Sequence, residues 1–389
     1  MPAAAPDSPT PDVLIVGLGP VGATLAALLA ADGVRVAVVE REVTPHALPR
    51  AAHLSDRSLD VLRRAGVADT VVAAGREIDG FELADRRGRS LLRARNAPAV
   101  PGLPTALLIH QPTVDAALRE RLRTLGVPTH LGATVTGVRQ DTGGATLSVH
   151  RGGRVSTLRA GLVVGADGAR STVRGAMGAR LSGGGFRQRW LVVDVLVPPA
   201  VGDRLPTRLV QTADPQQPRT YVPFPGRRRR WEWRLRDDEA DGQAEAPGAV
   251  RERLRTVLGA DADAVDIERA TVYTFYDLIA DRWWRGRLLL AGDAAHLMPP
   301  FLGEGLGEGL RDADVLAPLV RAVLDGAPLA TLGAYGAARQ RAVRRTTRRA
   351  VALGRLITLP EPLATLRDAA LRLGQRVPGL APRLLGWTV

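Results

Sequence analysis

The pattern of apolar and polar positions divides the chain into two kinds of segment. Short runs at 13–16, 35–39, 162–164 and 288–291, apolar throughout except at Arg35, are typical of buried parallel strands. Segments 53–66 and 111–126 have the apolar spacing of helices, and each ends at a glycine. Residues 133–158 predict a small β-meander. Longer runs rich in Val, Trp, Tyr and Phe between 186 and 277 predict a separate antiparallel sheet, with a polar loop at 237–248.

A glycine-rich turn, GLGPVG, joins the first apolar strand to an Ala/Leu-rich helix that ends near Ala31. In a dinucleotide-binding turn of this kind, Gly17 would permit the tight turn, Gly19 would let the backbone approach a pyrophosphate, and Gly22 would let helix and strand pack closely. The phosphates would lie at the helix N-terminus. Glu40 ends the next strand, where an acid that binds a ribose hydroxyl is expected. A tight turn without a ligand is the alternative for the glycines alone.

Two further motifs extend this site, GADGARSTVR at 165–174 and GDAAHLMPP at 292–300. Each motif alone could arise by chance. In this order and at these separations, the three motifs predict FAD held in an extended conformation across a doubly wound α/β domain.

Composition narrows the class of protein. A chain of 389 residues can form two intertwined domains, and the absence of cysteine excludes disulfides, thiol catalysis and cysteine metal sites. We expect residues 1–11 to be a flexible leader rather than a signal peptide, and the location to be cytoplasmic. Residues 13–31 are apolar, but their glycines and proline argue against a membrane span.

The net charge of +13 comes from arginine. Codon bias is one explanation, and the charge could also steer anionic cofactors and substrates to the site. We interpret the run Arg227–Arg230 as a solvated hairpin turn and expect no nucleic-acid partner, because no recognised binding motif surrounds the run.

The chain resembles the group A flavoprotein monooxygenases of the p-hydroxybenzoate hydroxylase fold. It is most similar there to 3-(3-hydroxyphenyl)propionate hydroxylases and polyketide-tailoring hydroxylases. The matching stretches include VLIVGLGPVG, VVEREVTPHALPRA, HQPTVDAALRE, VVGADGARSTVR, RTYVPFPGRRRRWEW and ADRWWRGRLLLAGDAAHLMPPFLGEGLGEGLRDA.

The resemblance implies an α/β fold with a doubly wound, glutathione-reductase-type Rossmann domain for FAD, an inserted antiparallel substrate sheet, and C-terminal helices. The FAD domain would comprise 12–75, 100–180 and 281–355. The substrate domain would comprise 76–99 and 181–280, and the C-terminal helices 356–389.

The resemblance also implies roles for individual residues. Asp293 would bond the ribityl chain, Arg50 would lie near the phosphates, and Gln111 near the flavin linkage. Arg174 would help to place the nicotinamide or, alternatively, form an ion pair at the sheet edge. The full set expected at FAD is Gly17, Gly19, Gly22, Glu40, Arg41, Arg50, Gln111, Asp167, Gly168, Arg174, Gly292, Asp293, Pro300, Gly303, Gly305 and Leu306, with no metal.

The implied reaction is hydroxylation of a phenolic or polyketide-type substrate. NADPH or NADH would reduce FAD, and O2 would react to form a C4a-hydroperoxyflavin that transfers its distal oxygen. Candidates for tuning the substrate hydroxyl are His53 and Tyr221, together with Tyr273 and Tyr276, although each tyrosine could simply pack in the sheet. Pro300 would shape the wall above the flavin, and His296 would order its loop. We expect a monomer or a homodimer.

The sequence departs from the family near the predicted flavin. The usual Gly-Gln-Gly is Gly303-Glu304-Gly305, and Glu308 replaces a small polar residue. Glu304 could act at the catalytic centre by opposing negative charge on reduced flavin, or it could cap the next helix. Pro318 should end or kink that helix.

These departures leave two alternatives open beside the hydroxylase. One is a Baeyer–Villiger or epoxidising oxygenase, or a flavin oxidase, of the same fold. The other is a redox-inert flavin-binding cyclase or carrier.

Overall fold

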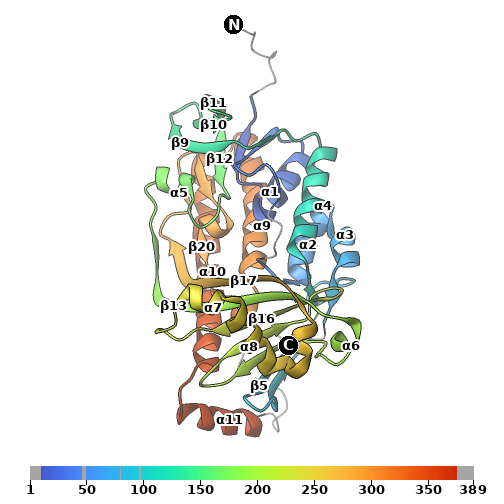
Figure 1. Cartoon of the computed structure of the whole chain (residues 1–389). Helices are drawn as coiled ribbons and strands as arrows, with labels where there is room; N and C mark the ends of the chain where they lie inside the picture. The colour runs from blue at the N-terminus through green and yellow to red at the C-terminus, as the bar shows by residue number, and fades with distance from the viewer. Residues whose placement is uncertain (1–9, 46–49, 79, 96–97, 375–389) are drawn as a thin grey trace.

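A computed structural model describes residues 10–45, 50–78, 80–95 and 98–374. The predicted leader lies almost entirely outside these residues. The chain contains two large sheets. In Figure 1, the first sheet and the helices that surround it form the upper half of the molecule, and the long strands of the second sheet cross below these helices.

The first sheet has six strands in the order β18-β19-β12-β1-β2-β8. All neighbours run parallel except β18 and β19. Its central strands are fully buried, as expected for a parallel sheet covered on both faces. The bounds are β1 Val13–Val16, β2 Val36–Glu40, β8 Thr129–Leu131, β12 Leu162–Gly165, β18 Trp284–Arg285 and β19 Leu288–Leu290.

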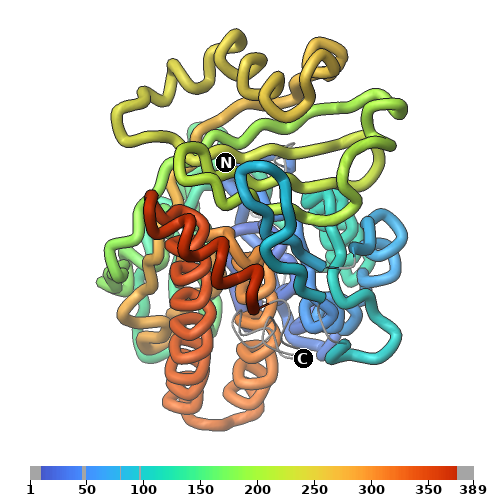
Figure 2. The backbone as a smooth tube through the Cα atoms, turned by 90° about the horizontal axis from the view of Figure 1, so that it is seen from below, coloured from blue at the N-terminus to red at the C-terminus, as the bar shows by residue number. Residues whose placement is uncertain are grey.

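Helices cover this sheet, and several coincide with the predicted periodic segments. Helices α9 and α10 lie side by side in Figure 2, and α11 crosses their end. No helix in the described part of the chain is long and apolar enough to cross a bilayer. The longer helices are α1 Pro20–Ala31, α2 Asp56–Arg64, α3 Ala68–Ala74, α4 Gln111–Thr124, α9 Gly305–Leu324, α10 Gly333–Ile357 and α11 Leu363–Gly374.

The second sheet has eight strands in the order β20-β17-β13-β16-β15-β14-β5-β6. Its strands pair antiparallel except for β14 with β5. The bounds are β5 Phe81–Asp85, β6 Ser90–Ala94, β13 Leu181–Leu196, β14 Leu209–Ala213, β15 Arg219–Val222, β16 Arg228–Arg234, β17 Asp266–Ala280 and β20 His296–Leu297.

Two small sheets and several short helices complete the described fold. Strands β11-β10-β9 form the predicted meander, and β3-β7-β4 join the two halves. The strand bounds are β3 His53–Ser55, β4 Arg76–Glu77, β7 Ala106–Leu108, β9 Thr134–Gln140, β10 Ala145–Arg151 and β11 Arg154–Ala160. The short helices include α5 Thr172–Ala176, α6 Pro199–Gly202, α7 Asp241–Glu245 and α8 Pro247–Leu258, and the 3₁₀ turns include η2 Gly292–Ala294 and η3 Pro300–Leu302.

The eight-stranded sheet has two chemically different faces. Trp231 and Trp233 of β16 are buried in an apolar cluster with Val250 and Leu254 of α8. Because side chains alternate along a strand, Arg230 and Glu232 lie on the opposite face. The outer face therefore forms a core beneath α8, and the inner face is free to build a site.

Three local predictions differ from the structure. The segment predicted as a polar loop at 237–248 contains α7 and the start of α8, and Pro247 occupies the first turn of α8, where proline is tolerated. Helix α9, which was expected to end or kink at Pro318, does not end there but continues to Leu324.

The third difference lies in the run Arg227–Arg230, which was expected to be solvated but is buried in its second half. Arg229 and Arg230 are only 6% and 3% exposed. The Arg229 guanidinium donates to main-chain oxygens that include Gly226 O at 2.8 Å, and Arg230 pairs with Asp194. The two guanidinium groups can be buried because carbonyl and carboxylate oxygens take the place of water as their hydrogen-bond partners.

Candidate active site

A cavity of about 540 Å³ lies between the two halves of the chain. It is lined by the glycine-rich turn and the GDAAH segment from one half and by the inner face of the eight-stranded sheet from the other. The predicted residues that line it are Gly17, Gly19, Glu40, Arg41, Arg50, His53, Gln111, Asp167, Gly168, Asp293, Pro300, Gly303, Gly305 and Leu306.

The remaining predicted residues do not line this cavity. Gly22 lies against the turn, where a Cβ would meet Gly17 O at 2.1 Å. Gly292 donates its N–H to the Asp312 carboxylate at 2.9 Å. The side chains of three more predicted residues make contacts elsewhere: Arg174 with Ala169 O, Tyr221 with Pro206 O, and Glu304 with Arg311.

The glycine-rich turn brings backbone close to backbone. Gly17 has φ +105°, and a Cβ there would lie 2.3 Å from Ala166 O. Helix α1 then begins at Pro20, and no side chain caps its N-terminus at Gly19. The helix therefore presents uncapped N–H groups and its positive dipole end to the cavity, which fits the pyrophosphate of a dinucleotide.

Glu40 lies at the end of β2 beside this turn. Its carboxylate accepts hydrogen bonds from Leu18 N at 2.7 Å and Glu42 N at 2.8 Å. These bonds hold the carboxylate at the cavity wall, where it fits a ribose hydroxyl.

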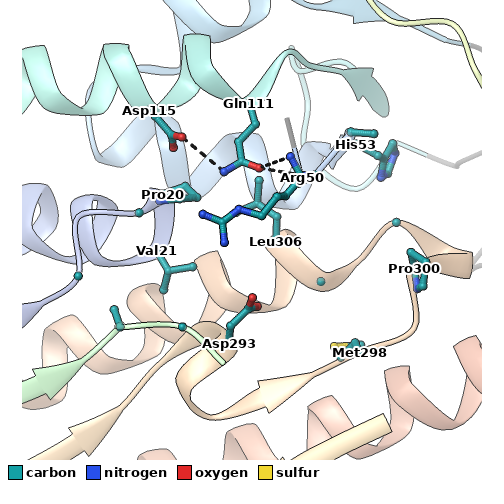
Figure 3. Close-up of a pocket in the computed structure, with 18 of the residues that line it drawn as sticks. Pro20, Val21, Arg50, His53, Gln111, Asp115, Asp293, Met298, Pro300 and Leu306 are labelled. Atoms are coloured by element: carbon teal, nitrogen blue, oxygen red, sulfur yellow. Dashed lines mark hydrogen bonds between the residues drawn. The ribbon is translucent and has the colours of Figure 1, made fainter. Parts of the chain in front are cut away.

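Arg50 and Gln111 form a second part of the cofactor end. The Gln111 side-chain oxygen accepts from Arg50 N at 3.1 Å and Ala51 N at 2.9 Å. Figure 3 shows the Arg50 guanidinium projecting between Pro20 and Asp293. A cation in this place complements the phosphates that the α1 N-terminus would bind.

Asp115 is a site residue that the sequence reasoning missed. It lies one turn after Gln111 on α4, lines the cavity, and accepts from the Gln111 amide at 3.4 Å. Burial raises the pKa of Asp115 to about 6. The sequence did contain a signal for Asp115, because it lies four residues after Gln111 and therefore on the same face of the predicted helix.

Asp167 orders the second motif. Its carboxylate accepts from Ser171 Oγ at 2.5 Å and from Thr172 N at 2.7 Å, at the start of α5. Arg174 donates to Ala169 O at 2.6 Å and to Ala294 O at 3.0 Å. Through these two main-chain carbonyls, Arg174 connects the segment 165–174 to the GDAAH segment.

A buried network of charges lies behind the GDAAH segment. Asp312, with no exposed surface, accepts from His296 Nε2 at 2.8 Å and from Arg339 Nε at 2.8 Å. Arg339 also pairs with Glu308, and Thr346 donates to Glu308 at 2.5 Å. The predicted role of His296 in ordering its loop fits these contacts, whereas Asp312 and Arg339 were missed because they come from distant helix positions.

Asp293 and Glu304 differ in their surroundings. Asp293 is open to the cavity, and the enclosing walls raise the pKa of its carboxyl above the ordinary value. Glu304 is the N-cap residue of α9 but makes no capping hydrogen bond. Its carboxylate instead accepts from Arg311 at 2.6 Å, so an arginine already offsets the charge that could oppose reduced flavin.

His53 and Tyr221 occupy different environments. His53 lines the cavity beside Gly303, and burial lowers the pKa of its imidazole. Tyr221 lies on the outer face of the sheet, tilted against Trp231, and donates to Pro206 O at 3.2 Å. Burial raises the pKa of Tyr221 to about 12. The alternation of side chains along β15 places its neighbours, and not Tyr221, in the cavity wall.

The inner sheet face carries a buried charge cluster that the sequence did not reveal. Asp194 accepts from Arg230 Nε at 2.6 Å and from Arg230 Nη2 at 3.1 Å, and it also pairs with Arg269. All three residues are at most 7% exposed. The cluster comes from three strands, so only the strand register brings it together.

This geometry agrees with the comparisons to known proteins. Residues 10–350 match the FAD binding domain family, and the chain belongs to that family. It is an FAD-binding oxidoreductase with a mixed α/β fold.

Named relatives refine the comparison. The chain is 36% identical to a probable NADH-specific resorcinol 4-hydroxylase of Rhodococcus jostii, over 92% of this chain and 68% of the relative. It is 38% identical to a 3-(3-hydroxy-phenyl)propionate/3-hydroxycinnamic acid hydroxylase of Mycolicibacterium smegmatis, over 95% and 65%. The chain thus spans about two thirds of the length of these curated relatives.

A solved structure matches over nearly its whole length. The p-nitrophenol 4-monooxygenase of Pseudomonas putida DLL-E4 superposes with a TM-score of 0.88 at 27% identity. The match covers 97% of this chain and 96% of that one.

Proposed function

We propose that the protein is an FAD-dependent monooxygenase that uses NADH or NADPH and O2 to hydroxylate an aromatic substrate. The observation that carries this proposal is a continuous cavity, which joins the uncapped N-terminus of α1 at one end to the inner face of the eight-stranded sheet at the other. A cofactor and a ring-sized substrate would meet in one enclosed space. The hydroxylase relatives support the same reaction class.

The residues of this chain would bind and orient the cofactor. The α1 N-terminus and Arg50 would neutralise the phosphates, and Glu40 would accept from a ribose hydroxyl. Gly305 and Leu306, at the start of α9, would place the positive end of that helix near the redox-active ring. When bound, FAD supplies the redox chemistry that delivers one oxygen atom from O2 to the substrate.

Other residues would control water and protons. Met298, Pro300 and Phe301 line the cavity as an apolar wall that would exclude water from the reacting centre. His53 has a lowered pKa, so its imidazole is largely neutral near pH 7 and could accept a proton from a substrate hydroxyl.

The proposal is tested by anaerobic reduction of the purified, FAD-loaded protein. NADH and NADPH would be mixed in turn with the protein, alone and with a panel of phenols, and flavin absorbance would be followed. We expect one reductant to bleach the flavin and one class of phenol to accelerate the bleaching. A flavin that stays oxidised with both reductants and every phenol would overturn the proposal and favour the redox-inert alternative.

A further inference from the structure

One row of polar side chains crosses the inner face of the eight-stranded sheet. The register pairs Gln211 of β14 with Thr220 of β15, and Thr220 with Glu232 of β16. All three residues line the cavity. Since neighbouring strands lie about 4.8 Å apart, the Gln211 and Glu232 backbones are separated by about 10 Å.

Both ends of this row can accept a hydrogen bond. Gln211 is 3% exposed, and its amide nitrogen donates to Phe301 O at 3.1 Å. Its side-chain oxygen is buried without a donor among the described residues. Leaving a buried acceptor unsatisfied costs free energy, which a hydroxyl group of a ligand would recover.

Glu232 is the charged end of the row. Its side chain is 12% exposed, and its Oε1 lies 3.7 Å from Arg230 Nη1, too far for a good hydrogen bond. Burial raises the pKa of Glu232, Arg230 opposes that rise, and Asp194 adds to it. A hydroxyl donor would stabilise the carboxylate form.

The two buried arginines beside this row, Arg230 and Arg269, already have an anionic partner. Arg230 holds Asp194 through two hydrogen bonds, and Arg269 pairs with the same carboxylate. The two arginines and the carboxylates of Asp194 and Glu232 sum to zero charge. A carboxylate on the substrate would find no uncompensated cation among these four groups and would be repelled by Glu232.

From this arrangement we infer that the sheet end of the cavity selects an uncharged aromatic ring with two or more hydroxyl groups, anchored by Glu232 and Gln211, over a phenol that carries a carboxylate. One such ring, with a hydrogen bond of about 2.7 Å at each end, has a reach similar to the spacing between strands β14 and β16. The inference rests on the proposed function, which it deepens by naming the substrate class.

The test measures binding, not turnover, by titration calorimetry on the FAD-loaded protein. The probes are resorcinol, which is uncharged, and 3-(3-hydroxyphenyl)propionate, which carries a carboxylate. The wild-type protein should bind resorcinol at least about tenfold more tightly than the carboxylated probe. Resorcinol would gain a charge-assisted hydrogen bond to Glu232, and only the carboxylated probe would be repelled by it.

Three variants sharpen the test. Glu232→Gln should weaken resorcinol binding about tenfold and strengthen binding of the carboxylated probe, a crossover that misfolding would not produce. Gln211→Met, which removes the amide at similar size, should weaken resorcinol only. Glu268→Gln, at an exposed partner of Arg228 on the same sheet, should change neither by more than about twofold.

Tighter binding of the carboxylated probe to the wild type, or equal losses of both probes in Glu232→Gln, would overturn the inference. Flavin content would confirm that each variant is loaded. Reduction by NADH or NADPH, measured separately, reports on the proposed function, so failure of one claim is distinguishable from failure of the other.

Discussion

The two ends of the cavity are built from different parts of the polypeptide. At the cofactor end, main-chain turns and helix termini shape the site, and the important residues are glycines and single carboxylates in continuous motifs. At the sheet end, side chains from separate strands shape it, and Asp194 holds two arginines within a buried cluster. The proposed cofactor contacts can therefore be predicted from local sequence, whereas the proposed substrate contacts depend on strand register.

The largest effect is expected from adding a side chain in the glycine-rich turn, which should abolish flavin binding at the cofactor end. Gly17→Ala would place a Cβ against Ala166 O at a positive φ, with strain of about 1–3 kcal/mol before any clash is counted. We expect purified protein with little or no bound flavin, measured by absorbance. Gly248→Ala is the control, because open space surrounds that position; equal flavin loss in both variants would contradict the account.

Breaking the sheet end should cost stability while leaving the glycine-rich turn intact. Asp194→Ala would leave Arg230 and Arg269 buried without their shared carboxylate, at a cost of about 3–5 kcal/mol in the free energy of unfolding. Urea unfolding would measure it. Asp238→Ala removes an exposed partner of Arg236 and should cost less than about 1 kcal/mol. Similar losses in the two variants would refute the buried-cluster argument.

Asp115 makes the cofactor end sensitive to pH. Its folded-state pKa of about 6 lies above the ordinary value near 3.8, so its neutral form stabilises the fold. That contribution is complete below about pH 4, is lost as the pH rises through 6, and amounts to at most about 3 kcal/mol.

Asp115→Asn should therefore be more stable than the wild type at pH 8 but not at pH 4, in unfolding of the flavin-free protein. Asp69→Asn, on the exposed surface of α3, serves as the control. A stability difference for Asp115→Asn that is the same at both pH values would show that burial of this carboxyl is not the cause.

The smallest effect is expected at Glu304. Because Arg311 already pairs with this carboxylate, Glu304→Gln should change the rate of flavin reduction by less than about threefold. Stopped-flow reduction by NADH would measure it. An acceleration of tenfold or more would restore the idea that this charge opposes reduced flavin.

Sequence reasoning was most successful where function and local structure share a continuous motif. It predicted the strands, turn and helix around Gly17 and Gly19, and it placed Glu40, Asp167 and Asp293 at what is the cavity wall. It misread the arginine run because nothing local indicates that Arg230 meets a carboxylate 36 residues away.

The sheet end could not be predicted for the same physical reason. Gln211, Thr220 and Glu232 form one row only after three strands adopt their register, and a shift of one residue would send them to the outer face. Tyr221 illustrates the point, because it neighbours Thr220 in sequence yet packs against Trp231.

Incorporation of ¹⁸O from ¹⁸O2 into a phenolic product tests the central claim most directly. The FAD-loaded protein would be supplied with NADH or NADPH and resorcinol, and the product would be analysed by mass spectrometry. The account predicts one labelled oxygen per product molecule in a new ring hydroxyl, with one reductant consumed for each. Reductant consumption that yields only hydrogen peroxide, or no consumption at all with any hydroxylated ring tested, would contradict it.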